Sequence, residues 1–270
     1  MKRWICLLLA LLLLGSVCAC GKKDPNAFRT LRLVGTKQYS VLCRGGDRLA
    51  PVIDAAMATM AENGTLGAII TRWLGNDRCC YDTKNAVTLA ELDEESLPEP
   101  RLLLIGVDSD AYPLAYTDAY GGADGLCVDI ARALGETLGW DIRLISITPD
   151  SVAAQLSSGN VDCALGFDAS IVDSEKYSAG GSFLESEILL AVRNGSDVRR
   201  LRDLKGTRVG TVNDPAVLRA LKGNEKVTKY AAGATEYLSL PRCIEALDAG
   251  WCSAVVLDEL MLRFYRQNDK

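Results

Sequence analysis

Arg101-Leu-Leu-Leu-Ile-Gly-Val107 is a nearly continuous apolar run of strand length. Strands that are buried on both faces have this composition, and they are typical of parallel sheets covered by helices. From Cys127 to Leu138, apolar residues then recur at helical spacing, and Gly139 is a residue type that commonly ends a helix. The two segments together predict a strand followed by a helix, the unit of an α/β fold.

The same alternation continues toward the C-terminus. Apolar runs predict further strands at residues 142–147, 161–166, 187–192, 207–212, 226–230 and 253–257. Amphipathic or capped segments predict helices at residues 152–156, from Asp214-Pro215 onward, at 240–247 and at 258–266. This repeated order predicts α/β layers around a mostly parallel sheet.

Residues 28–75 form a shorter unit upstream. Residues 31–35 and 39–43 are predicted to be two strands, and residues 47–62 carry apolar positions at helical spacing. Residues 76–100 are polar and acidic and contain two prolines, so they are predicted to be a linker between this unit and the rest of the chain.

Residues 1–19 are predicted to be a signal peptide. Lys2 and Arg3 precede an apolar run at residues 4–14 that is too short to span a bilayer. The run leads to Val17-Cys-Ala-Cys20, which resembles the lipobox of bacterial lipoproteins. This resemblance implies lipidation of Cys20 (palmitate among the acyl groups), a tether at residues 20–27, and an extracytoplasmic protein anchored to the bacterial cell membrane. The alternative is an ordinary secretory signal cut near Ala19.

Composition excludes several classes of site. The formal net charge of −5 disfavours nucleic acid as a partner. The chain has no histidine, which excludes histidine triads and histidine metal sites. It has ten cysteines but no Cys-x-x-Cys pair, so zinc-ribbon and thioredoxin-like sites are excluded as well. No catalytic residue, metal or cofactor is therefore expected, and the chain is predicted not to be an enzyme.

Five of the seven cysteines after residue 20 fall into two groups. Cys43, Cys127 and Cys163 lie within apolar patterns and are predicted to be small buried side chains. The vicinal Cys79 and Cys80 are compatible with a strained disulfide, with pairing to other thiols, or with free thiols, and the sequence leaves these open.

Several motifs resemble the family 3 solute-binding proteins of bacterial amino-acid ABC importers. Gly125-Leu-Cys-Val-Asp129 resembles the "GFDVD" start of a family helix, and residues 101–266 resemble the fold from its first strand onward. Asn63-Gly-Thr65 and Trp73-Leu-Gly75 resemble the "DGT" and "WFG" with which family chains close. Because the closing stretch comes first here, the resemblance implies a circularly permuted chain. A remnant of a neighbouring copy fused upstream is the alternative.

The resemblance implies a two-lobed, type II periplasmic-binding-protein-like fold with hinge strands at residues 39–43 and 188–193. The implied parts are a lobe 2 strand and hinge at 28–43, lobe 1 at 44–188 with the linker at 76–100, and a hinge with the remainder of lobe 2 at 189–270. A monomer is expected, and a domain-swapped dimer, in which each hairpin completes its neighbour, is the alternative.

The resemblance also implies a ligand site between the lobes. In lobe 1 it places Asp108 at a motif aspartate and Tyr112 beside the position of a stacking aromatic residue. In lobe 2, Asn213 and Asp214 replace an anion-binding "sGT" turn, and Asp258 stands where the family places the aspartate that receives a ligand ammonium.

A second lobe 1 motif departs further from the family pattern. The family grips an amino acid there through a glycine carbonyl, a threonine and an arginine. Gly166 keeps the glycine, Asp168 replaces the threonine, and Ser170 follows within the same turn. The arginine has no direct counterpart, and Lys176 is the candidate for its role, although lysine lacks the planar fork that binds a carboxylate bidentately.

These substitutions favour a cationic ligand. Four candidate acceptors are kept or added, namely Asp108, Asp168, Asp214 and Asp258, while the grips on a carboxylate are weakened. The predicted ligand is therefore a basic amino acid or an amine without a carboxylate. The alternative is that Asp168 and Asp214 cap local turns and that ordinary amino acids bind.

The predicted function is that of an extracytoplasmic binding lipoprotein. Its lobes would close around an amino acid or related amine, and the permease of an ABC importer would receive it. The alternative is a sensor or scaffold that kept the fold without transport. An enzyme is disfavoured by the lack of histidine and of a paired carboxylate motif.

Overall fold

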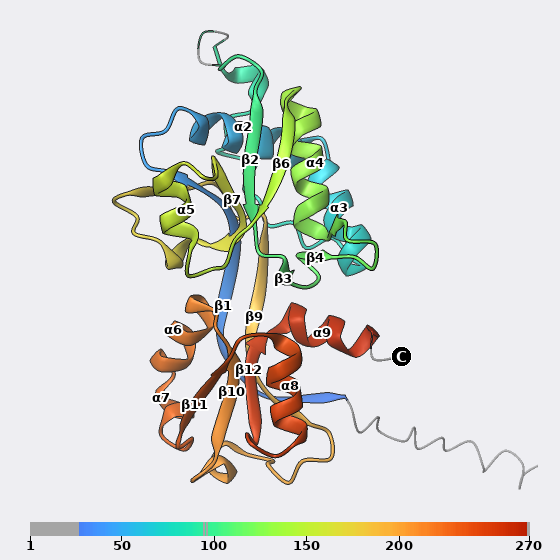
Figure 1. Cartoon of the computed structure of the whole chain (residues 1–270), viewed down its shortest axis with the longest axis vertical. Coiled ribbons are helices and arrows are strands. Elements are labelled where there is room, and N and C mark those ends of the chain that lie inside the picture. Colours follow the sequence, from blue (N-terminus) through green and yellow to red (C-terminus); the bar gives the residue numbers. More distant parts are fainter. Residues whose placement is uncertain (1–26, 94, 96, 269–270) are drawn as a thin grey trace, which may run out of the picture.

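The computed structural model describes residues 27–93, 95 and 97–268, which form two lobes joined by two long strands (Figure 1). These strands are β1 (Phe28–Arg44) and β9 (Leu184–Arg193), and they pair antiparallel over the length of β9. The predicted signal peptide, the lipidation at Cys20 and nearly all of the tether lie outside the described residues.

One sheet runs through both lobes in the order β11-β10-β12-β9-β1-β7-β2-β6. The other strands of this order are β2 (Leu102–Val107), β6 (Asp141–Ser146), β7 (Cys163–Asp168), β10 (Arg208–Val212), β11 (Gly233–Tyr237) and β12 (Ala254–Asp258). The strands β2, β6 and β7 are parallel in lobe 1, and β10, β11 and β12 are parallel in lobe 2. The predicted α/β fold is therefore confirmed, with antiparallel pairing at the two crossing strands.

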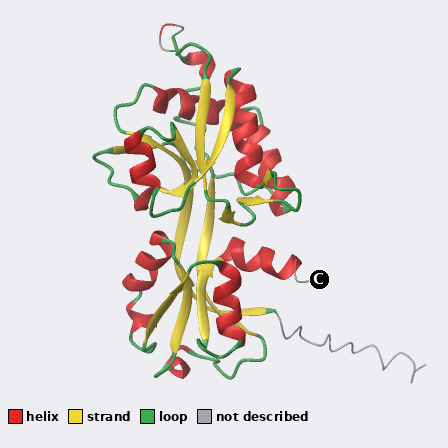
Figure 2. Cartoon of the chain, viewed as in Figure 1, coloured by secondary structure: helices red, strands yellow, loops and turns green. Residues whose placement is uncertain are grey.

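Helices cover both faces of this sheet (Figure 2). Lobe 1 carries α2 (Leu49–Glu62), α3 (Thr65–Leu74), α4 (Leu126–Leu138) and α5 (Val152–Ser158), together with the 3₁₀ turns η1 (Leu89–Glu91) and η3 (Ala169–Ile171). Lobe 2 carries α6 (Pro215–Gly223), α7 (Glu225–Thr228), α8 (Leu240–Asp248), α9 (Glu259–Asn268) and the turn η4 (Leu201–Leu204). The short strand β8 (Tyr177–Ala179) pairs with β1, and a small separate sheet consists of β3 (Asp110–Ala111), β4 (Ala115–Thr117) and β5 (Ala123–Asp124).

The first strand of the described chain lies in the middle of the sheet, between β9 and β7. Two strands were predicted at 31–35 and 39–43, but the structure has the single strand β1. The polar stretch between them continues the ladder, because residues 36–38 pair with residues 185–187 of β9. Within the described sheet these six residues pair with no third strand, so the chain crosses between the lobes there, just before the two predicted hinge ranges.

The predicted strand at residues 226–230 is wrong, because the short helix α7 occupies this position. The Asn224 side chain accepts a hydrogen bond from the backbone N–H of Val227, which caps the first turn. The strand of this region is β11, which begins at Gly233 and forms the edge of the sheet in lobe 2.

The predicted linker at 76–100 includes the 3₁₀ turn η1 and an isolated β-bridge between Cys79 and Leu184, and it packs against lobe 1. The Tyr81 hydroxyl donates to Asp54 Oδ1 of α2 at 2.6 Å, and the backbone N–H of Leu89 donates to Thr59 Oγ1 at 3.0 Å. The stretch thus holds α2 in place as well as connecting two parts of the chain.

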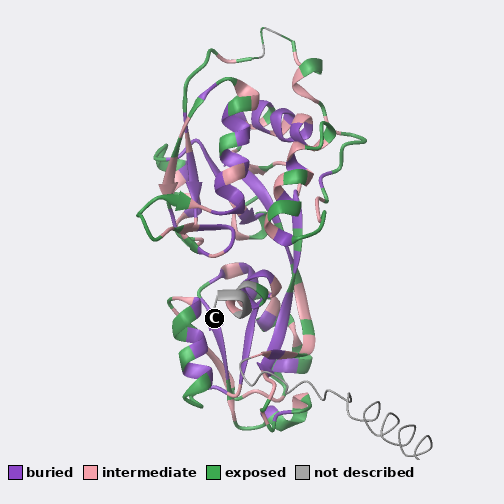
Figure 3. Ribbon diagram, turned by 90° about the vertical axis from the view of Figure 1, so that its right-hand side faces the viewer, coloured by how far each residue is buried: buried purple, intermediate pink, exposed green. Residues whose placement is uncertain are grey.

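Three groups of buried apolar side chains hold the molecule together. One group runs along a single face of the sheet through both lobes, and it includes Tyr39, Leu189 and Leu257 on the sheet itself. The other two groups lie one in each lobe. Figure 3 shows the same distribution, with buried residues along the strands and exposed residues on the outer surfaces of the helices. Among the described residues, no helix has both the length and the apolar character needed to cross a membrane.

Candidate functional site: a cleft between the lobes

A cleft of about 250 Å³ lies where the two lobes face each other, beside the crossing strands. Lobe 1 supplies Asp108, Asp110, Thr148, Pro149 and Asp150 to its lining, and lobe 2 supplies Val212, Asn213, Asp214, Leu238, Ser239, Leu240 and Met261. The lining contains four carboxylates and neither lysine nor arginine. It therefore suits a ligand with positive charge, and it offers apolar contact along Leu240 and Met261.

Asp108 directly follows the buried strand β2, which carries its side chain to the cleft. Its Oδ1 accepts a hydrogen bond from the backbone N–H of Asp110 at 3.1 Å. Burial, assisted by the neighbouring carboxylates of Asp110 and Asp214, raises the pKa of the Asp108 carboxyl to about 6. The charge of Lys37 opposes this rise, and a cationic ligand in the cleft would likewise stabilise the ionised form of Asp108.

Asp214 reaches the cleft from lobe 2 at the start of α6. Its Oδ1 accepts hydrogen bonds from the backbone N–H groups of Ala216 and Val217, and Pro215 occupies the first turn, as the sequence predicted. Its Oδ2 lies 2.5 Å from Nζ of Lys37, a residue of the crossing segment of β1. Asp214 is therefore both a helix cap and half of a buried ion pair.

Lys37 is a functional candidate that the sequence analysis missed. Burial, the largest effect, lowers the pKa of Lys37, but the carboxylates of Asp214 and Asp258 raise it by more, so the lysine stays charged. Its ammonium lies 4.7 Å from the centre of the Tyr39 ring. The alternation of side chains along a strand could have shown that Lys37 lies on the same face of β1 as Tyr39. It could not have identified the acidic partner of Lys37, which is 177 positions away.

Asp258 is fully buried and its carboxylate is already bound by the protein. Oδ2 accepts from the Tyr39 hydroxyl at 2.5 Å, while Oδ1 accepts from the Ser186 hydroxyl at 2.6 Å and from the backbone N–H of Leu260 at 2.7 Å. Burial raises the pKa of Asp258 despite the opposing effect of Lys37. Its position as an ammonium acceptor stays a prediction, and three donors of the protein already bind this carboxylate.

Asp168 ends β7 and caps the turn η3. Its Oδ1 accepts from the backbone N–H of Ser170 at 2.8 Å, and its Oδ2 accepts from the backbone N–H of Gln38 at 2.8 Å. The second bond ties lobe 1 to the crossing segment of β1. Both Asp168 and Asp214 cap local turns, as the alternative interpretation of the sequence expected, and Ser170 itself is exposed.

Six of the nine predicted site residues do not line the cleft: Asp168, Ser170 and Asp258, described above, and Tyr112, Gly166 and Lys176. Lys176 lies beside the far end of β1 and pairs with Asp173 on the surface, so its predicted role in place of the arginine is not supported by its position. Tyr112 packs edge-to-face against Tyr116, with 4.7 Å between ring centres. Gly166 has φ +85°, and a Cβ there would lie 2.6 Å from the sulfur of Cys127, so two separate constraints require glycine.

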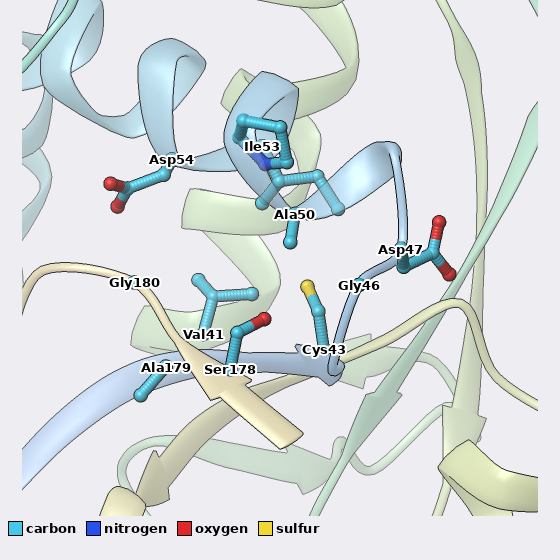
Figure 4. A pocket seen from close by; sticks show the side chains of 11 residues that line it. Val41, Cys43, Gly46, Asp47, Ala50, Ile53, Asp54, Ser178, Ala179 and Gly180 are labelled. Carbon is cyan, nitrogen blue, oxygen red and sulfur yellow. The ribbon is translucent and has the colours of Figure 1, made fainter. Parts of the chain in front are cut away.

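A second pocket, of about 350 Å³, lies within lobe 1 between β1, β8 and α2 (Figure 4). Its two carboxylates are already engaged. Asp54 accepts from the Tyr81 hydroxyl and from the Gly181 N–H, and Asp47 binds the Arg44 guanidinium and the Leu49 N–H. The cleft between the lobes, where open carboxylates remain, is therefore the better candidate for a ligand site. In the part of the chain that the structure describes, no group of three or more potential metal ligands occurs.

Two lobes that face each other across a cleft, joined by paired crossing strands, define a ligand-binding protein of the two-lobed α/β class. Residues 103–252 match the model of the bacterial extracellular solute-binding proteins, family 3. This match covers more than half of the chain, and the chain therefore belongs to that family. The match leaves out β1, α2 and α3 at one end and β12 and α9 at the other.

Three individual proteins show further similarity. The arginine-binding extracellular protein ArtP of Bacillus subtilis (strain 168) is 20% identical over 169 residues, which are 62% of this chain and 65% of ArtP. An ATP phosphoribosyltransferase of Desulforudis audaxviator (strain MP104C) is 40% identical over only 62 residues, which are 22% of this chain and 21% of that enzyme. The chain thus spans less than two thirds of either curated relative.

The third is a substrate-binding protein of an ABC uptake transporter from Streptococcus pneumoniae, solved with bound histidine. It aligns with a TM-score of 0.57 at 21% identity, over 62% of this chain and 70% of that one. At this identity the similarity shows the fold, and it confirms the predicted type II binding-protein architecture.

Proposed function

We propose that this protein captures a cationic amino acid or amine between its lobes and delivers it to an ABC importer. The observation that carries the proposal is the cleft between the lobes, which four carboxylates line without a lysine or arginine among them. Family membership supports the solute-binding role, and the name of ArtP, an arginine-binding relative, supports the choice of a cationic ligand.

Closure of the lobes follows from where the acids lie. Asp108, Asp110 and Asp150 belong to lobe 1, and Asp214 belongs to lobe 2. Because Asp214 is already paired with Lys37, an ammonium of the ligand would be attracted mainly to the lobe 1 carboxylates, while Leu240 and Met261 of lobe 2 would make apolar contact with the rest of the ligand. Binding would therefore favour the closed arrangement, which the permease of the importer would recognise.

The chain order is proposed to be a circular permutation of the family fold, with lobe boundaries at 44–188 and 189–270. Support comes from the position of β1 in the middle of the sheet and from the family match, which begins only after α3. Phe28 pairs with Arg193 of lobe 2 and α9 packs on lobe 2, so both described ends belong to one lobe (Figure 1). A monomer in which the N-terminal segment docks on its own chain is proposed, and a swapped dimer is the alternative.

Lipid anchoring through Cys20 is part of the same proposal, and its support is the lipobox-like Val17-Cys-Ala-Cys20. An extracellular solute-binding family agrees with an extracytoplasmic protein held at the bacterial cell membrane. A binding function without catalysis is proposed, because the family to which the chain belongs is one of solute-binding proteins.

Thermal unfolding of the protein from Lys22 onward, against amino acids and amines, tests the proposal. A ligand that binds only the folded state adds about 2.7 kcal/mol of stability at a hundredfold excess over its dissociation constant. Arginine, lysine and putrescine are expected to raise the unfolding temperature, while glutamate and leucine are expected to leave it unchanged. Selective stabilisation by glutamate would overturn the cationic specificity.

A sensor or scaffold that has lost tight binding is the second candidate. It is favoured by the buried ion pair of Asp214 with Lys37. In this pair the lysine ammonium takes the place next to Asp214 that a cationic ligand would otherwise take. A cooperative transition that none of the tested compounds moves would support this candidate over transport.

A further inference from the structure

Cys43 of β1 and Cys163 of β7 lie directly opposite each other in the antiparallel ladder that joins these strands. Directly opposed residues of neighbouring strands project to the same face of a sheet. Both side chains accordingly belong to the same group of buried residues, with exposed fractions of 3% and 0%. The register therefore sets two thiols side by side in the centre of lobe 1.

This arrangement meets the geometric requirement of a disulfide. Opposed residues in an antiparallel pair have Cα atoms about 4.5–5.5 Å apart, and disulfides accept Cα separations of about 4.4–6.8 Å. The second pocket borders Cys43, whose sulfur points into it (Figure 4), so this side chain is not packed on all sides. Both cysteines are free thiols in the structure, and their register alone places them within this range.

We propose that Cys43 and Cys163 form an intramolecular disulfide that fastens β1 covalently into the sheet of lobe 1. The bond would join β1, which precedes the family match, to β7, which lies within it. Without the bond, these two parts of the chain are connected by non-covalent contacts and by the linker at 76–100. It rests on the extracytoplasmic location proposed above, because disulfides persist in oxidising compartments and are rare in the cytosol.

The chemistry is a thiol–disulfide exchange with a disulfide oxidant, either a protein oxidoreductase of the cell envelope or an oxidised low-molecular-weight thiol. One cysteine thiolate attacks the oxidant and displaces one of its sulfurs as a thiolate, giving a mixed disulfide. The second cysteine thiolate then attacks that mixed disulfide and releases the other sulfur. Two protons leave the protein and two electrons pass to the oxidant, which ends as a dithiol or as two thiols.

The bond forms before β1 is fully docked. Burial raises the pKa of Cys43 to about 12 and raises that of Cys163 well above its ordinary value, so both thiols are neutral in the folded protein. Neutral buried thiols do not exchange readily, because the thiolate is the reactive form. The same burial then protects the completed disulfide from reductants.

Peptide mapping of the full chain, isolated from the cell envelope and alkylated on lysis, tests the proposal. Trypsin without reductant should release Gln38–Arg44 and Leu144–Lys176 as one linked species, and each of these peptides contains a single cysteine. Reduction should abolish that species and yield the two separate peptides. Recovery of both peptides solely in alkylated form would overturn the proposal, whatever ligand the protein binds.

Variants and gel mobility complete the test. Cys43→Ser should leave the Cys163 peptide alkylated, whereas the matched Cys127→Ser, which removes another buried thiol, should keep the linked species. The linked species must also come from a band of monomer mass on a non-reducing gel. If it comes only from a disulfide-linked dimer, the bond joins two swapped chains and the intramolecular proposal is wrong.

Discussion

Lys37 Nζ lies 2.5 Å from Asp214 Oδ2, with both side chains less than 10% exposed, and this ion pair joins the crossing strand to the lobe 2 side of the cleft. The pair connects residues that are 177 positions apart. Asp258 and Asp168 add their charges to the surroundings of the ammonium. Three of the four aspartates that the sequence suggested for a ligand thus surround a lysine of the protein itself, and Asp108 is the one that remains open.

Replacing Lys37 with methionine should destabilise the fold by about 3–5 kcal/mol, because it leaves the buried Asp214 carboxylate without its counter-ion. Urea unfolding followed by circular dichroism measures the effect. Lys176→Met is the matched control: its ion pair with Asp173 is exposed, so a change within about 0.5 kcal/mol is expected. Adding Asp214→Asn to Lys37→Met should recover part of the loss, and strict additivity of the two single changes would contradict the coupling.

The stability of the protein should depend on pH through Asp108. Its pKa of about 6 in the folded protein lies above the ordinary value of 3.8, so the folded state binds this proton more tightly than the unfolded state. The stabilising contribution of the group is therefore full below its unfolded pKa and is lost as pH rises through about 6. Asp108→Asn, which cannot ionise, should gain stability relative to the parent protein between pH 4 and pH 7 in urea titrations.

Asp173→Asn provides a control of opposite sign for the Asp108 prediction. The backbone N–H of Glu175 and the ammonium of Lys176 lower the pKa of Asp173. This carboxylate therefore stabilises the folded protein above its unfolded pKa, and its replacement should lose stability relative to the parent as pH rises. A pH profile of Asp108→Asn parallel to that of the parent protein would contradict the role given to Asp108.

Local patterns predicted most of the fold, because they depend on short-range chemistry. Apolar runs located β2, β7 and β12, and the Asp214-Pro215 pair located the start of α6. The patterns failed where pairing with a distant strand decides the structure. Thr36, Lys37 and Gln38 resemble a turn in composition, yet β9 holds them in an extended ladder.

The site was harder to predict for the same reason. Asp108, Asn213 and Asp214 line the cleft as the family motifs suggested. The motifs could not show which carboxylates already bind other groups of the protein, because those groups come from other helices and strands. Asp258 illustrates this, since its carboxylate accepts hydrogen bonds from Tyr39 of β1 and Ser186 of β9 as well as from its own helix.

Removing the Tyr39 hydroxyl should destabilise the fold without removing the cleft. Tyr39→Phe keeps the ring and deletes the donor to the buried Asp258 carboxylate, at an expected cost of about 1–3 kcal/mol. Chemical unfolding measures the loss. Tyr120→Phe, at a tyrosine that is 97% exposed, is the matched control and should be neutral. Equal stabilities of the two variants would mean that Asp258 does not depend on Tyr39.

Asp108 should also control the affinity for cations in the cleft. Asp108→Asn removes a charge-assisted contact with a ligand ammonium, which corresponds to a loss of about 10- to 100-fold in affinity for arginine or putrescine. In the parent protein, the affinity should fall as pH drops through about 6, because protonation removes the same charge. Calorimetric titration at pH 5 and pH 8 measures both effects, and in Asp108→Asn the pH dependence should largely disappear.

Ser170→Ala, at an exposed residue that does not line the cleft, should bind like the parent. If Asp108→Asn binds these cations as tightly as the parent at pH 8, the ligand does not contact this carboxylate.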